Sequence, residues 1–285
     1  MFMAVINPLT PQRVVQVADN LPSAPRVLAE LQELLKDANN GIDEVSGLLR
    51  RDAGLTARVM RIANGIVYNK GDPVVSLEEA MGRVGFNEVY RLAGMASLAE
   101  MSGFQLRFYG VSAARLRENS LLTALLMEEW TMEFGANSRL AFTVGLMRSV
   151  GKIALEATAQ KDRPFQRATP IGSTPLLRWE AETFGPKNND VAAVLRGWKF
   201  PADLYVPVRD HYLHNLAVDP LPLAKFLNLA AAAAEAAGFG MPGEAPYWAA
   251  VAAALPGELG LAPELITRGT ERACSRFEKI RMALD

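Results

Sequence analysis

The sequence predicts an all-α protein built from two packed helical bundles. Apolar residues recur at helical spacing along most of the 285 residues, and the alternation that is typical of strands is sustained nowhere. Capping residues, proline and glycine fall between the apolar stretches, where they separate helices instead of breaking them. We expect an N-terminal helical bundle over residues 1–110 and a second helical bundle with a C-terminal helical extension over residues 111–285, with a joint at residues 103–110.

Capping residues predict where the helices of the N-terminal half begin and end. The expected N-caps are Thr10 (followed by Pro11), Ser23, Asp52 and Ser76, which opens the capping box Ser-Leu-Glu-Glu. The helix that follows Ser23 should end at 39–41, a short helix should carry Val45, Leu48 and Leu49, and Asn64-Gly65 should close the helix after Asp52. Gly85 should stop the helix that Ser76 opens, and a further helix should cover 87–101.

Longer helices are expected in the C-terminal half. One should cover residues 112–134, and a second should run without interruption over residues 138–159. The segment 160–174 has the chemistry of a loop and is long enough to gate a binding site. Helices should then resume at Pro175, Asp190, Ala202, Pro222, Pro246 and Pro263.

Composition and charge narrow the class of protein. Half of the residues are hydrophobic and 21% are charged, which is ordinary for a globular fold. The net charge of −1 offers no overall basic field for nucleic acid or for an anionic membrane. The N-terminus lacks the pattern of a signal peptide, and no apolar run reaches the length of a membrane span. The single cysteine, Cys274, excludes an intrachain disulfide and is interpreted as a small helix residue. We therefore expect a cytoplasmic protein.

Histidine is scarce in this chain. Only His211 and His214 occur, although histidine is the commonest metal ligand and general base. Most hydrolase sites would need more. We expect His211 to have its hydrogen bonds satisfied within a helix and His214 to lie near a helix end.

Four phrases, in order along the chain, resemble the HDOD family, the HD-related output domain of bacterial signalling proteins. The resemblance covers residues 20–212 and implies an all-helical, HD-like fold with a signalling role. The phrases are Leu21-Pro22-Ser23-Ala24-Pro25, residues 51–64 (Arg-Asp-Ala-Gly-Leu-Thr-Ala-Arg-Val-Met-Arg-Ile-Ala-Asn), residues 75–85 (with Ser76, Ala80 and Val84-Gly85) and Trp198-Lys199-Phe200-Pro201.

The resemblance also locates a metal site whose ligands are missing. Residues 145–152 read Gly-Leu-Met-Arg-Ser-Val-Gly-Lys, whereas a similar phrase in HD phosphohydrolases reads Gly-Leu-Leu-His-Asp-Ile-Gly-Lys. Arg148 and Ser149 thus stand where the metal-binding His and Asp would be, and the other vestigial positions fall at Asn119, Asn188 and His211. A guanidinium repels a divalent ion, and one imidazole cannot hold it. The resemblance therefore implies that the protein is not an enzyme, with no catalytic residue, no metal and no cofactor.

Each residue of this phrase also has an ordinary structural interpretation. Arg148 could clamp a phosphate in the former HD cleft, but pairing with a nearby carboxylate is the favoured prediction, and Lys152 could share either role. Ser149 is expected inside a helix with its hydroxyl bonded backward to a carbonyl.

A basic cluster offers a nucleic-acid alternative. Its members are Arg50, Arg51, Arg58 and Arg61, which flank a turn at 52–54 in the manner of a helix-turn-helix. The favoured interpretation is a solvated face, with some of the arginines paired to Asp43, Glu44 or Asp52.

The function that the resemblance implies is non-catalytic signal transduction by protein–protein interaction. No sensor or receiver domain flanks the matching phrases, so we expect signalling proteins bound in trans, in two-component or cyclic di-GMP pathways. The groove between the bundles or an apolar patch should hold a partner's helix or loop. The alternatives are a phosphate- or nucleotide-binding sensor that uses Arg148, a diverged phosphodiesterase and a DNA-binding protein. The sequence predicts no oligomeric state.

Overall fold

The computed structural model describes residues 8–21, 24–35, 41–65, 71–101, 105–162, 171–212, 222–249 and 253–284. Over these residues every element of regular secondary structure is a helix. The only pairing of extended backbone there is an isolated bridge between Leu106 and Val111. The prediction of an all-α fold is confirmed. No described helix has the length and apolar character needed to cross a membrane.

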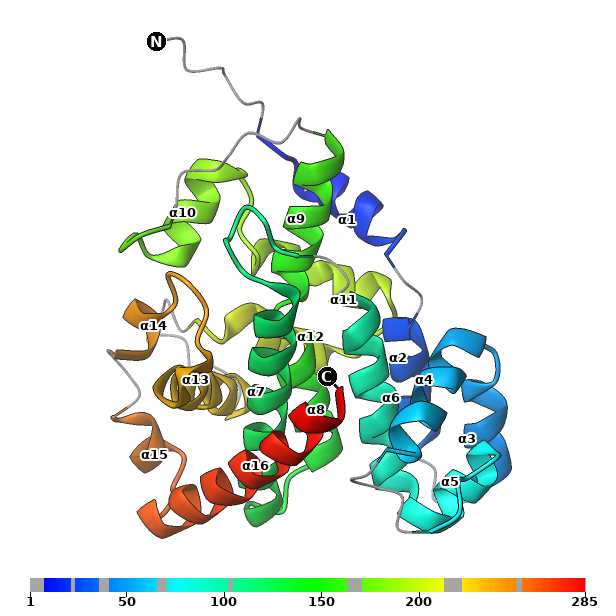
Figure 1. Ribbon diagram of the computed structural model, residues 1–285. Coiled ribbons are helices and arrows are strands. Elements are labelled where there is room, and N and C mark those ends of the chain that lie inside the picture. The colour runs from blue at the N-terminus through cyan, green and yellow to red at the C-terminus, as the bar shows by residue number, and fades with distance from the viewer. Residues whose placement is uncertain are drawn as a thin grey trace.

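The helices follow one another in the order shown in Figure 1. They are α1 (Pro11–Ala18), α2 (Ala24–Leu34), α3 (Ile42–Leu49), α4 (Ala53–Ala63), α5 (Leu77–Val84), α6 (Phe86–Met101), α7 (Ala113–Glu133), α8 (Ser138–Met147), α9 (Val150–Asp162), α10 (Leu176–Thr183), the 3₁₀ turn η1 (Asp190–Ala192), α11 (Ala193–Gly197), α12 (Ala202–Asp210), α13 (Pro222–Ala234), the π turn η2 (Glu235–Phe239), α14 (Ala245–Ala249), α15 (Leu255–Glu258) and α16 (Pro263–Leu284).

The predicted caps explain where many of these helices begin. The side chains of Thr10, Asp52 and Ser76 each accept a hydrogen bond from a backbone amide of the first turn that follows, at 2.9–3.2 Å. Gly85 ends α5 with φ at 86°, a value that favours glycine. Ser23 and the loop residues 163–170 lie outside the described part of the chain, so those two predictions are not addressed.

Two features of the helix pattern differ from the prediction. The helix expected over 138–159 is two helices, because α8 ends at Met147 and α9 begins at Val150, with Arg148 and Ser149 between them. α9 also continues to Asp162, so the loop expected from residue 160 begins later. The break falls on Arg148 and Ser149, the two positions that the resemblance assigns to the metal-binding His–Asp pair.

The helices form two groups around α6 and α7. In Figure 1, α2 to α5 gather at one side of the molecule beside α6, and α7 runs through the other group, where it packs against α8, α13 and α16. α1 lies with the second group because it packs along α9. One continuous apolar core joins both groups. The domain boundary expected at residue 110 stays a prediction. α1 precedes this boundary in the chain but packs with the helices that follow it.

The C-terminal helix is held to α7 by ion pairs. Arg272 and Arg276 on α16 contact the buried carboxylates of Glu128 and Glu129 at 2.7–2.9 Å, and Arg91 of α6 also reaches Glu128 at 2.8 Å. These arginines explain why α7 can carry two adjacent acidic residues that are buried, since each carboxylate has a cationic partner.

Candidate functional site

Two glycines of the residue 145–152 phrase bring the helix break into the interior. A Cβ atom on Gly145 would lie 2.5 Å from the Cα of Ala124 on α7, and one on Gly151 would lie 2.1 Å from the carbonyl oxygen of Asn188. Only glycine therefore permits these two close approaches. Together they hold the α8–α9 junction against α7 on one side and against the segment before η1 on the other.

Arg148 and Lys152 consequently have no access to solvent, and both are paired with one carboxylate. Glu244, in the turn before α14, contacts the Nη2 of Arg148 at 2.5 Å and the Nζ of Lys152 at 2.8 Å. All three side chains are at most 1% exposed. We call these residues, with Tyr212 and Asn119, the Glu244 cluster.

The remaining two members complete the hydrogen bonds of the cluster. The Tyr212 hydroxyl accepts from the Nζ of Lys152 at 2.7 Å and donates to Oε1 of Glu244 at 3.1 Å. Asn119 on α7 accepts from Arg148 through Oδ1 and donates through Nδ2 to the carbonyl of Phe239 at 2.7 Å. The guanidinium of Arg148 also lies over the ring of Trp248, 5.8 Å from its centroid.

The charges of the cluster depend on one another. Burial alone would raise the pKa of the Glu244 carboxyl, but Arg148 and Lys152 outweigh burial and lower this pKa to about 2. Burial lowers the pKa of Lys152, and the charge of Glu244 opposes this effect. Glu244 and Arg148 are therefore ionised at neutral pH, and the charge of the carboxylate is balanced from within the chain.

His211 lies beside the cluster as an uncharged side chain. Its pKa is lowered well below the ordinary value because the ring is buried and because Arg148 and Lys152 are near. Nδ1 lies 2.7 Å from the carbonyl of Val208, and the ring stacks near Trp248. Nε2 has no hydrogen-bond partner among the described residues. The prediction that the hydrogen bonds of His211 are satisfied therefore holds for Nδ1 and not for Nε2. His214 lies outside the described residues.

Ser149 does not lie as predicted. It sits between α8 and α9, and its buried hydroxyl has no hydrogen-bond partner in the part of the chain that the structure describes. The expected back-bond to a helix carbonyl is therefore wrong: α8 ends at Met147, two residues before Ser149.

Asn188 belongs to a neighbouring buried cluster around Glu180. Oε2 of Glu180 accepts from the backbone and the side-chain amides of Asn188, both at 2.8 Å, and Oε1 accepts from the Tyr109 hydroxyl at 2.8 Å. Burial raises the pKa of Glu180 to about 7, although Lys152 and these donors oppose the rise.

This pKa predicts an unusual dependence of stability on pH. Between the ordinary value of 4.5 and about 7, the folded protein holds a proton on Glu180 that the unfolded chain has lost, so this group's contribution to stability falls as pH rises through the window. We expect the difference in free energy of unfolding between wild type and Glu180→Gln to fall across pH 5–7, with a slope of up to about 1.4 kcal/mol per pH unit. Urea titrations at a series of pH values measure it.

Taking the difference removes other titrations from this measurement. His211 acts in the opposite direction below pH 6.5, because its folded pKa is lowered, but it is present in both proteins and cancels. A wild-type and variant difference that does not vary with pH would show that Glu180 keeps an ordinary pKa.

The five vestigial positions do not fit the metal of an HD phosphohydrolase. Arg148 and Asn119 are bonded to each other, and Ser149 adjoins them, but the centre of the site is a guanidinium and not a ligand. Nowhere in the described ranges do three or more His, Cys, Asp or Glu side chains come together to hold a metal ion. The favoured pairing of Arg148 with a carboxylate is what the structure shows, whereas its partner, Glu244, was not predicted from the sequence.

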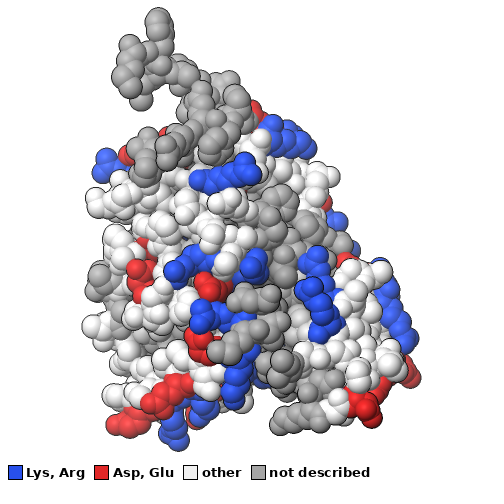
Figure 2. All heavy atoms as spheres, viewed as in Figure 1, with Lys and Arg blue, Asp and Glu red and all other residues white. Residues whose placement is uncertain are grey.

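Two arginines of the basic cluster pair with carboxylates other than the predicted ones. Arg50 contacts Glu78 at 2.6 Å, Arg51 contacts Glu30 at 3.1 Å and Arg58 reaches the carbonyl of Ala96 at 3.5 Å. Glu78 lies on α5 and Glu30 on α2, so Arg50 and Arg51 pair with carboxylates that the tertiary fold brings near and not with those of the adjacent turn. On the face shown in Figure 2, basic and acidic side chains are interspersed, with both signs along α16.

Comparisons with solved structures agree with this fold. The chain is similar to an HDOD domain protein of unknown function from Geobacter sulfurreducens, with 18% identity, a TM-score of 0.65, and coverage of 96% of this chain and 98% of that chain. It is similar to a putative signal transduction protein from Marinobacter aquaeolei VT8, with 20% identity, a TM-score of 0.72, and coverage of 97% and 62%. A putative phosphohydrolase from Shewanella amazonensis SB2B gives 22% identity, a TM-score of 0.60, and coverage of 95% and 97%.

Identities this low establish the fold alone, and a search of curated proteins found no match. The family is established by sequence. The model of the HDOD domain matches residues 21–214, which include the α8–α9 junction and all of the phrases that suggested the resemblance. The chain therefore belongs to the HDOD family, a signalling-associated family related to the HD phosphohydrolases.

Proposed function

We propose that this protein is a non-catalytic signalling module that acts by binding other proteins. The observation that carries the proposal is the Glu244 cluster, which includes Arg148 and Asn119, two of the positions that the resemblance assigns to the metal ligands of HD enzymes. A guanidinium cannot be deprotonated near neutral pH, so Arg148 opposes a divalent ion at this position. The carboxylate that could attract a metal there, Glu244, is neutralised by Arg148 and Lys152.

The cluster also argues against an anion sensor at Arg148. This side chain is fully buried, with Nη1 on Asn119 and Nη2 on Glu244. An external phosphate would have to displace Glu244 from two cations and reach them through the core. We therefore assign Arg148 a structural role.

A groove between the two helix groups suits a segment of a partner protein. It lies between α2, α3 and the turn after α11, with a volume of about 1190 Å³. Five carboxylates and three cationic side chains line it: Asp19, Glu30, Glu33, Asp43 and Glu44, against Arg26, Arg51 and Lys199. The excess of carboxylates favours a partner helix or loop that carries Lys or Arg, because complementary charge selects partners and speeds encounter.

The metal content and the hydrolytic activity of the purified protein test the proposal that it is not an enzyme. We expect metal far below one ion per chain in protein prepared without chelators, and no hydrolysis of bis(p-nitrophenyl) phosphate with added Mn²⁺ or Mg²⁺. A stoichiometric metal, or metal-dependent turnover that Arg148→Ala abolishes, would overturn it.

The same preparation, used as bait, tests the binding part. A partner retained by the wild type should be lost on the double charge reversal Glu30→Lys with Asp43→Lys, and kept by Glu182→Lys, a reversal on the exposed surface of α10. Retention of the partner by the double variant would contradict binding in the groove.

A further inference from the structure

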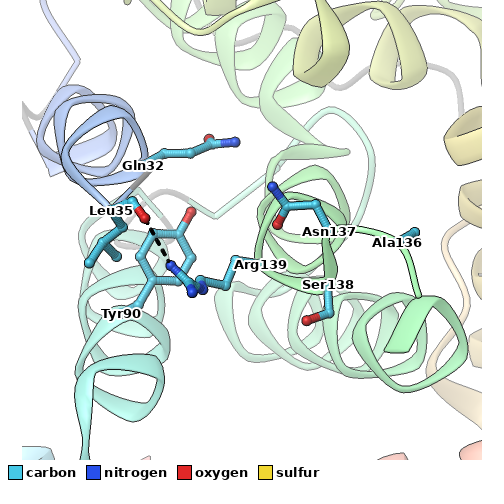
Figure 3. A pocket seen from close by; sticks show the side chains of 7 residues that line it. All are labelled: Gln32, Leu35, Tyr90, Ala136, Asn137, Ser138 and Arg139. Atoms are coloured by element: carbon cyan, nitrogen blue, oxygen red, sulfur yellow. Dashed lines mark hydrogen bonds between the residues drawn. The ribbon is translucent and has the colours of Figure 1, made fainter. Parts of the chain in front are cut away.

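A small pocket lies where the two helix groups meet, apart from the Glu244 cluster and from the groove. Gln32 and Tyr90 line it from α2 and α6, and residues 136–139 line it from the start of α8 (Figure 3). Its volume is about 300 Å³, at the lower end of the range for small-molecule sites. The pocket is thus sized for a small molecule.

The carboxamide of Gln32 makes no hydrogen bond to any residue that the structure describes. The side chain is only 5% exposed, and neither Oε1 nor Nε2 has a partner among the described residues. Figure 3 shows this group pointing from α2 into the pocket, toward the start of α8. An unpaired buried amide is costly, so a group that occupies the pocket is the natural partner for both of its polar atoms.

Positive charge faces the same space from two sources. α8 begins here, capped by Asn137, whose Oδ1 accepts from the amide of Leu140 at 3.1 Å. The other first-turn amides and the helix dipole favour an anion at this end. The half-buried guanidinium of Arg139 also lies here, where Nη1 is 3.4 Å from the carbonyl of Leu35, and the described chain gives it no carboxylate partner.

A hydrogen-bonded chain fixes the wall of the pocket. The Tyr90 hydroxyl bonds to Oγ1 of Thr143. The Thr143 hydroxyl in turn donates to the backbone carbonyl of Arg139 at 3.1 Å. Burial raises the pKa of Tyr90 to about 12, so its phenol stays neutral beside the arginine. The backbone that carries Arg139 is therefore anchored to α6 before any ligand binds.

We propose that this pocket binds a small phosphate monoester that carries a neighbouring hydroxyl group. The phosphate accepts hydrogen bonds from Arg139, from the start of α8 and from Nε2 of Gln32. Oε1 of Gln32 can only accept, so it requires a donor, which the ligand's hydroxyl supplies. Such a ligand contacts α2 and α6 on one side and α8 on the other, so its binding ties the two helix groups together and gives a signalling module a chemical input.

Isothermal titration calorimetry with two probes at constant ionic strength tests the proposal. Glycerol 3-phosphate has the hydroxyl and methyl phosphate lacks it. We expect saturable binding of both to the wild type, with glycerol 3-phosphate tighter by about three- to tenfold. Arg139→Gln should weaken both probes by about ten- to a hundredfold, whereas Arg178→Gln, on the exposed surface of α10, should leave both unchanged.

Gln32→Leu separates recognition from folding. Leucine has a similar volume and no polar atoms, so the free variant should melt at a higher temperature than the wild type, while its preference for glycerol 3-phosphate disappears. The absence of saturable binding for both probes would show a pocket filled by water and overturn the proposal. Binding that Arg139→Gln leaves intact, or a preference for the hydroxyl that survives Gln32→Leu, would overturn it as well.

Discussion

Replacing Glu244 by glutamine is expected to lower the free energy of unfolding by about 3–5 kcal/mol, the range found when one partner of a buried ion pair is removed. The loss is large because the variant leaves the fixed charge of Arg148 buried without a compensating carboxylate, and removes from Lys152 the ion pair that opposes the effect of burial on its pKa. Glutamine keeps the shape of the side chain, so the change isolates the charge. Urea denaturation at pH 7 measures it.

A surface glutamate provides the control for this measurement. Glu182 pairs with Arg178 in the same way, but the two side chains are 60% and 75% exposed. Glu182→Gln should change stability by less than about 1 kcal/mol, because exposed ion pairs contribute little. Equal effects of the two substitutions would contradict the picture of a sealed, charged cluster.

Acid titration supplies a second signature of the same carboxylate. Because the pKa of Glu244 is lowered to about 2, its stabilising contribution is present above pH 4.5 and is lost as pH falls toward 2. The wild type should lose this contribution in that window, and Glu244→Gln, which has nothing to protonate there, should not.

Local signals in the sequence predicted the parts of the fold that local interactions determine. Asp52 and Ser76 cap helices because a cap joins a side chain to an amide three residues away, and such spacing can be read directly. Gly85 was recognisable for the same reason. The break between α8 and α9 was not, since residues 138–159 have uninterrupted helical character in the sequence.

The candidate site depends on residues that are far apart in the sequence, and this limits how much of it the sequence can predict. The resemblance assigned Arg148 to a metal-ligand position of HD enzymes, but Glu244 lies 96 residues further along the chain in a turn with no motif. Tyr212 and Glu180 were missed for the same reason. What could be predicted was that a buried guanidinium needs a carboxylate, because burying an unpaired charge is prohibitive. Which carboxylate it takes is a property of the tertiary fold.

The residue 145–152 phrase thus combines two kinds of information. Gly145 and Gly151 serve packing, and they occupy the positions that the HD phrase also gives to glycine. Arg148 and Ser149 stand at the ligand positions and bring different chemistry. The close helix contacts do not depend on a metal, so the scaffold can persist after its ligands have been replaced.

Gly151→Ala measures how tightly that scaffold is packed. We expect a loss of about 3 kcal/mol or more, at or above the upper end of the usual cost of overpacking, because the added methyl group would lie 2.1 Å from a backbone oxygen and 2.7 Å from a backbone carbon of Asn188. Backbone atoms in a packed core cannot move aside as a flexible side chain does. Lys152 follows Gly151 directly, and Arg148 precedes it by three residues. The shift should therefore also disturb the ion pairs of the Glu244 cluster.

The matched control is Gly47→Ala, in the middle of the short helix α3. A Cβ atom there would meet nothing within 4 Å, so alanine should stabilise the protein by about 0.5–1 kcal/mol through its better helix propensity. The two substitutions are chemically identical, both lie in α-helices and they should differ in sign. If Gly151→Ala were neutral or stabilising, the α8–α9 junction could relax away from Asn188, and close packing would not be what holds Arg148 and Lys152 in the interior.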